Sequence, residues 1–148
     1  MSKFARAFIV LLFVSILVMI TSINVSVADD TTCSISLISD LAFGSLSAGG
    51  LSSEKTVAIT NDGESATTSL QISGQPWTSG SNSFDVSATH FSTTSGEEYS
   101  AMNQLSTIPF DLANLEPSSS ETVYFRVMVP NNKEYGNYEQ TITFTVTC

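Results

Sequence analysis

The stretch TITFTVTC, Thr141–Cys148, alternates between threonine and apolar or cysteine side chains. Successive side chains of a β-strand point to opposite faces, so this pattern predicts a strand whose Ile142, Phe144 and Val146 face a core while its threonines face water. No stretch of useful length with a helical period follows Ala28. The pattern therefore predicts an all-β domain.

The same alternation recurs along the chain, and turn residues separate the runs. The runs are CSISLIS (33–39), KTVAIT (55–60), TTSLQIS (67–73), SFDVSATH (83–90) and TVYFRVMV (122–129), with one short strand expected around Leu105–Phe110. Between the second and third runs, Asn61-Asp62-Gly63 is typical of a hairpin connection. About seven short strands with such punctuation predict an antiparallel immunoglobulin-like β-sandwich.

The first 28 residues have the three parts of a secretory signal peptide. These are the positive Lys3 and Arg6, the apolar run Ala7–Ile20, and the small residues Ser26 and Ala28 before a cleavage site at Asp29. We therefore expect a signal peptide at 1–28, a single sandwich domain at 29–148, and a secreted, extracellular or cell-surface location. The alternative is an uncleaved anchor, which is the one route by which we expect contact with a membrane.

The charge of the chain is one-sided and excludes several classes of partner. The full chain has 5 basic and 14 acidic residues, and removal of Lys3 and Arg6 leaves only Lys55, Arg126 and Lys133 as cations. Neutralising phosphates needs several lysines or arginines, so we expect no nucleic-acid partner. The acidic surface also argues against binding to anionic membranes and favours a soluble, self-repelling exterior.

Two cysteines, Cys33 and Cys148, lie at opposite ends of the expected domain. An even pair in an oxidising compartment predicts a disulfide, and both positions share the inward parity of their strands. A bond between subunits and two free thiols are the alternatives. Closing so long a loop is worth about 4–5 kcal/mol in the chain-entropy model.

The stretch GSLSAGGLSSEKTV (44–57) begins like a phosphate-binding glycine loop. Leu51 stands where that loop needs a lysine, and the residues that follow alternate as a strand rather than starting a helix. We therefore expect no nucleotide. Gly44 and Gly49-Gly50 instead predict a bulge and a turn with positive φ.

These residues carry a resemblance to a known family. Phe43-Gly44-x-Leu46, the glycine pair, Asn61-x-Gly63, TVYFRVMVP and Gly136-x-Tyr138 together resemble immunoglobulin-like domains of the abnormal-spindle/hydin type and related secreted prokaryotic modules. Part of the pattern is also similar to the β-sandwich subunits of archaeal bundling pili and bacterial biofilm fibres. That second resemblance implies export by an ordinary signal peptide and polymerisation by strand donation, although no donor strand is identified in the sequence.

Few residues suggest chemistry, and we predict no enzyme, metal or cofactor. His90 is the only histidine and shares the inward parity of its run, which favours a structural role. Trp77 in a loop could stack on a sugar or plug the end of the sandwich. The adjacent Glu97 and Glu98 could bind calcium or remain solvated loop charges.

The final strand suggests a mode of association. Thr141, Thr143, Thr145 and Thr147 form one row, and the strand contains no lysine or proline to blunt an exposed edge. We therefore predict a non-enzymatic structural or adhesive protein that associates with itself or with other proteins by β-augmentation, in a fibre, a matrix or the envelope. The alternative is a soluble extracellular module that binds carbohydrate or calcium through Trp77, Glu97 and Glu98.

Overall fold

The computed structural model describes residues 17–27 and 34–148. In this part of the chain the regular elements are twelve strands and one 3-10 turn, η1 (Val86–Ala88), which confirms the all-β prediction. We expected about seven strands, and half of the twelve are only two to four residues long. No helix in the described ranges has the length and hydropathy needed to cross a membrane.

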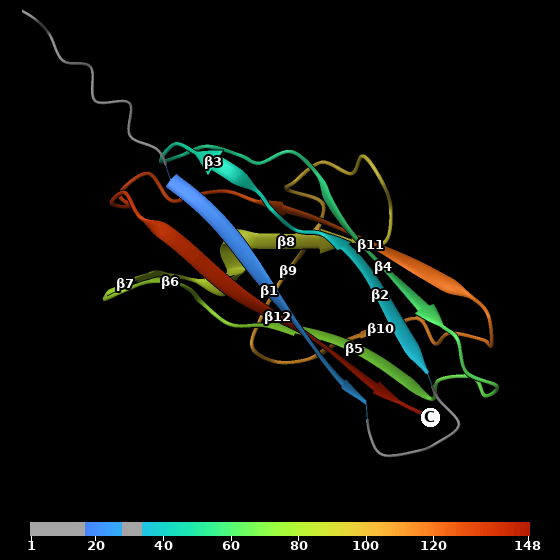
Figure 1. Cartoon of the computed structure of the whole chain (residues 1–148). Helices are drawn as coiled ribbons and strands as arrows, with labels where there is room; N and C mark the ends of the chain where they lie inside the picture. The colour runs from blue at the N-terminus through green and yellow to red at the C-terminus, as the bar shows by residue number, and fades with distance from the viewer. Residues whose placement is uncertain (1–16, 28–33) are drawn as a thin grey trace, which may run out of the picture.

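The first sheet has the strand order β10-β5-β12-β1-β3, with the β6–β7 hairpin attached to β12 (Figure 1). Its strands are β1 (Leu17–Val27), β3 (Gly44–Leu46), β5 (Ser69–Gly74), β6 (Trp77–Ser79), β7 (Asn82–Phe84), β10 (Phe110–Leu112) and β12 (Asn137–Thr147). All paired strands in this sheet are antiparallel except β1 and β12, which run parallel.

The second sheet has the order β2-β4-β11-β8-β9 and is antiparallel throughout. Its strands are β2 (Ile35–Asp40), β4 (Lys55–Asn61), β8 (Thr89–Ser92), β9 (Asn103–Gln104) and β11 (Ser120–Val127). The two sheets together form a sandwich of two layers (Figure 1).

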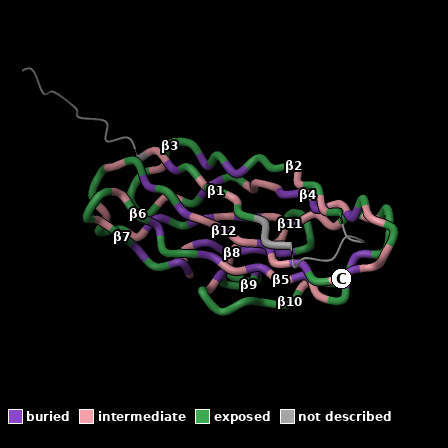
Figure 2. The backbone as a smooth tube through the Cα atoms, turned by 60° about the horizontal axis from the view of Figure 1, so that its bottom comes forward, coloured by how far each residue is buried: buried purple, intermediate pink, exposed green. Residues whose placement is uncertain are grey.

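The core lies between the sheets and is built from the predicted alternation. Buried and partly exposed residues alternate along β4, β5 and β12 (Figure 2). The fully buried aliphatic and aromatic side chains of these strands and of β11 are Val57, Ile59, Leu70, Ile72, Val123, Phe125, Val127, Tyr138, Ile142, Phe144 and Val146. Removal of this apolar area from water, at about 25 cal/mol per Å², is the main favourable term for the fold.

The predicted hairpin at Asn61-Asp62-Gly63 is wrong, because β4 and β5 belong to different sheets. Asn61 is fully buried, and its amide nitrogen donates to the carbonyl oxygens of Ser65 (2.8 Å) and Leu115 (3.1 Å). Its side-chain oxygen accepts from the backbone N–H of Gly63 at 3.0 Å. The asparagine thus satisfies the backbone of a loop that crosses from one sheet to the other.

The run 83–90, expected as one strand, is divided between the two sheets. It contributes to β7, to η1 and to β8, in that order. The carboxylate of Asp85 accepts from the backbone N–H of Ser87 at 2.8 Å and caps η1. This local hydrogen bond competes with strand pairing and turns the chain from the first sheet into the second.

The turn with positive φ predicted at Gly49-Gly50 forms, with the positive φ at Gly49. Gly44 and Gly49 have φ values of 73° and 76°, which glycine adopts without steric cost. A Cβ atom on Gly49 would meet the side-chain oxygen of Asn131, so that side chain would have to move aside. The Gly49 N–H donates to the Val129 carbonyl at 2.9 Å, which ties this turn to the end of β11.

Candidate functional site

The edge of β12 that faces β1 is the feature of this fold most suited to association. β5 pairs with β12 on one side, from Gly74 opposite Ile142 to Ser69 opposite Thr147. β1 pairs with it on the other, from Val18 opposite Asn137 to Val27 opposite Val146. In the full-length chain β12 is therefore an interior strand, and the predicted exposed edge is covered.

The strand that covers this edge comes from the segment expected to be a signal peptide. We expected the fold to begin after Ala28, whereas Leu17–Val27 is a strand of the first sheet in the full-length chain. Figure 1 shows β1, in blue, lying along β12, in red, near the end of the chain. Cleavage before Asp29 remains a prediction, and it would remove the whole of β1.

β1 inserts one face into the core. Met19 is 1% exposed and belongs to the main hydrophobic cluster, and Ile23 packs against that cluster. Thr21 lies between them on the same face, and its hydroxyl oxygen is buried. Ile20, by contrast, points outward and is 49% exposed. The strand is therefore a component of the core rather than a loose edge.

β1 also holds β3 in the sheet. β3 pairs antiparallel with the first part of β1, with Leu46 opposite Leu17 and Gly44 opposite Met19. In the described residues, β3 has no other strand partner. We call the space between β12 and β3, which residues 17–27 fill, the β1 slot.

The sequence of β1 combines a strand pattern with the features of a signal peptide. Residues Met19–Asn24 read MITSIN, in which apolar or β-branched residues alternate with smaller polar ones after Ile20. Such alternation favours a strand, but the apolar run that precedes it is typical of an export signal. Two readings thus compete for the same residues.

The threonine row of β12 lies on the outer face, as expected. Thr141, Thr143 and Thr145 are half-buried, and Thr147 is exposed, while the residues between them are buried. The row therefore lies on the solvent-facing side of the sheet. Pairing with another strand uses the backbone edge of β12 and not this row of side chains.

The three residues predicted to contact a ligand do not converge. Trp77 is fully buried, and its indole N–H donates to the Thr89 hydroxyl at 2.8 Å, so its ring has no exposed face for a sugar. The structure places it in the core, which corresponds to the plug reading. Glu97 accepts a hydrogen bond from the Ser92 hydroxyl, and Glu98 is exposed. Across the described residues, no group of three or more His, Cys, Asp or Glu could hold a metal ion.

His90 is buried, but not on the core face that its parity predicted: in β8 it lies opposite Arg126, whereas its neighbour Phe91 pairs with Phe125 of the core. His90 is 6% exposed and its ring stacks on Tyr99, with the ring centroids 3.8 Å apart and the planes 11° from parallel. Its Nδ1 lies 2.7 Å from the Tyr99 carbonyl oxygen. The histidine therefore anchors the 92–99 loop to β8.

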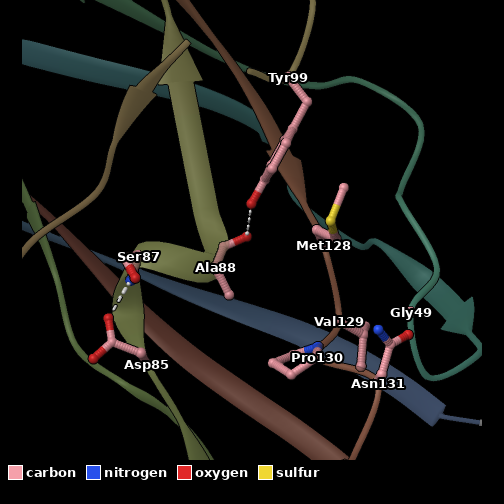
Figure 3. A pocket seen from close by; sticks show the side chains of 9 residues that line it. All are labelled: Gly49, Asp85, Ser87, Ala88, Tyr99, Met128, Val129, Pro130 and Asn131. Carbon is pink, nitrogen blue, oxygen red and sulfur yellow. Dashed lines mark hydrogen bonds between the residues drawn. The ribbon is translucent and has the colours of Figure 1, made fainter. Parts of the chain in front are cut away.

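A surface pocket of about 320 Å³ opens beside this stack (Figure 3). Its apolar wall comes from Tyr99, Met128 and Pro130, and Asp85 and Asn131 stand at its polar side. The Tyr99 hydroxyl donates to the Ala88 carbonyl at 2.9 Å. Hydrogen bonds from Ser87 hold the pKa of Asp85 below its ordinary value. The Asp85 carboxylate and the Tyr99 hydroxyl thus make hydrogen bonds within the protein.

Tyr99 gives the protein a predicted alkaline sensitivity. Burial raises the pKa of Tyr99, with an opposing hydrogen bond from the Met128 backbone. Because the pKa of Tyr99 is higher in the folded chain than in the unfolded chain, its contribution to the free energy of unfolding is fully present below the unfolded pKa, about 10. This contribution is lost as the pH rises through the folded pKa. We expect urea midpoints to fall above pH 10, and to fall less in Tyr99→Phe. An identical alkaline slope in the two proteins would contradict this assignment.

One end of the predicted disulfide can be placed. Cys148 follows β12, is half-buried and packs against the core cluster. Its predicted partner, Cys33, lies outside the described residues. The pairing of the two cysteines therefore stays a prediction.

Neither the profiles of known protein families nor the sequences of curated proteins match this chain. Among solved structures, a family 123 glycoside hydrolase from Clostridium perfringens, studied for glycolipid glycan hydrolysis, aligns with a TM-score of 0.46 and 8% identity. The alignment covers 86% of this chain and 23% of the hydrolase chain. A similarity of this size carries no argument about fold or activity.

Proposed function

We propose that this protein is a secreted or cell-surface structural component that associates with other proteins by accepting a β-strand beside β12. The observation that carries the proposal is the position of β1. A segment with the sequence of an export signal supplies the parallel partner of β12 and part of the core. The proposal includes an immunoglobulin-like arrangement of the sandwich and a non-enzymatic role.

Removal of residues 1–28 would leave the domain incomplete. The backbone of β12 from Asn137 to Val146 would lose its partner on one side, and β3 would lose its place in the sheet. Unpaired N–H and C=O groups on a long edge are a template for strand addition. The only charged residue of β12 is Glu139, so little on the strand opposes pairing.

The remaining surface suits an exported protein with protein partners. With Lys3 and Arg6 removed, residues 29–148 hold three basic against 14 acidic residues. This charge favours solubility and disfavours nucleic acids, so the partner that fits the edge is another polypeptide. Main-chain hydrogen bonds supply the affinity in such strand addition, and the alternate side chains supply the specificity.

The proposal is tested with the full-length chain carrying a protease site in place of Asp29–Thr32. After cleavage, the chain is unfolded in urea, freed of the N-terminal fragment and refolded with a fluorescent peptide of residues 17–27. We expect saturable binding of the peptide, measured by fluorescence anisotropy, and the return of the native circular dichroism spectrum.

The uncut chain, whose own β1 fills the slot, is the matched control and should take up no peptide. A cleaved chain that refolds fully and binds none of the peptide would show that the sandwich needs no added strand. Equal binding to the cut and uncut chains would show that the peptide attaches elsewhere. Either result would overturn the proposal.

A further inference from the structure

β1 fits its slot imperfectly at one position. The Thr21 side-chain oxygen is buried and has no hydrogen-bond partner. It lies opposite Gln140, whose side chain is already engaged with Thr89 and with the Gln75 carbonyl, at 2.8 and 2.9 Å. A buried hydroxyl without a partner has lost its hydration and gained nothing in exchange.

We propose that the β1 slot is a docking site for an uncharged strand of a separate protein, which runs parallel to β12 and places valine or isoleucine where β1 places Thr21. This inference rests on the proposed function and specifies its partner. Valine has the shape of threonine without the hydroxyl, so it fills the same space and leaves no polar atom unpaired.

The other positions of β1 define the rest of the occupant. The Met19 position, fully buried beside Gly44, takes a long apolar side chain, and the Ile23 position takes an aliphatic one. Ser22 and Asn24 are exposed and set no such requirement. Leu17–Val27 contains no charged residue, in keeping with a strand that lies along the core.

A second copy of the processed domain is a poor source for this strand. The runs with alternating apolar residues in the described range 34–148 already form β2, β4, β5, β11 and β12, so a copy would have to give up a strand of its own sandwich. Residues 28–32, Ala-Asp-Asp-Thr-Thr, are polar and acidic. Two copies also repel each other through their shared negative charge.

The test is a competition on the cleaved full-length chain refolded with the fluorescent peptide of residues 17–27. Unlabelled peptides with the native sequence, Thr21→Val, Thr21→Ser and Ser22→Ala compete for the slot. We expect Thr21→Val to bind about five- to 150-fold more tightly than the native peptide, the range that corresponds to relieving one unpaired buried hydroxyl. Thr21→Ser should bind more weakly, because it loses a methyl group and keeps the hydroxyl.

Ser22→Ala is the matched control, since it removes a hydroxyl from the exposed face and should compete like the native peptide. Native and Thr21→Val peptides that bind equally would overturn this inference and leave the proposed function standing. Failure of every peptide to bind would overturn both. Formation of homo-oligomers by the cleaved chain without peptide, with β12 protected from hydrogen exchange, would assign the slot to a second copy and refute the separate-protein partner.

Discussion

Replacing Met19 with aspartate in the full-length chain is expected to release β1 from the sandwich. Met19 is 1% exposed, so the variant loses a buried apolar side chain, which typically costs about 2–5 kcal/mol. It must also bury a carboxylate, which adds a further cost of several kcal/mol. The segment 17–27 avoids both costs when it leaves the β1 slot. Limited proteolysis should then cut within residues 17–34, and β3 should lose its protection from hydrogen exchange.

The neighbouring position provides the matched control. Ile20 is 49% exposed on the opposite face of β1, so Ile20→Asp places the same charge one residue away in water. We expect this variant to keep β1 in place and to resist proteolysis like the native chain. Equal release of β1 by the two substitutions would show that the described facing of the strand is wrong.

Replacing Trp77 with alanine is expected to lower the free energy of unfolding by about 3–5 kcal/mol. The indole ring is fully buried, stacks on Phe84 with a centroid distance of 5.7 Å and meets Phe43 edge-on at 6.0 Å. It also donates to the Thr89 hydroxyl. A loss of this size is a large share of the 5–15 kcal/mol that typically separates folded from unfolded domains. Urea denaturation followed by circular dichroism measures it.

Tyr135→Ala is the control for the loss of an aromatic ring, because Tyr135 is 65% exposed. We expect it to change the urea midpoint little. A Trp77→Ala protein of native stability that has lost an affinity for glycans would restore the ligand-contact reading of Trp77 and contradict its place in the core.

The sequence predicted those parts of the fold in which one local pattern decides the structure. In β4, β5 and β12, alternating side chains face a single core, so the buried residues could be named in advance. The turn at Gly49 was also predictable, since few residues other than glycine adopt its φ.

The sequence did not predict the structure at places where the chain passes from one sheet to the other. Asn61-Asp62-Gly63 has the composition of a hairpin, but the buried Asn61 binds the carbonyl of Leu115, which is far away in sequence. Residues 83–90 alternate like one strand, yet Asp85 diverts the chain into a second sheet. Such outcomes depend on tertiary contacts that no local pattern encodes.

The candidate site was half predictable. The threonine row and the unblunted character of β12 were visible in TITFTVTC, and they motivated the hypothesis of strand addition. The occupant was not visible, because residues 17–27 follow directly on an apolar run of signal-peptide type. Only the register of Val18 to Val27 against Asn137 to Val146 identifies that segment as a strand matched to this edge.

Hydrogen exchange at β12 tests the account most directly. The backbone amides of Asn137–Val146 that face β1 are compared in the full-length chain, in the chain cleaved after Ala28 and freed of residues 1–28, and in that chain with the peptide of residues 17–27 added. We predict slow exchange in the first state, fast exchange in the second and restored protection in the third. Equal protection of these amides in all three states would show that β12 needs no strand beside it and would contradict the account.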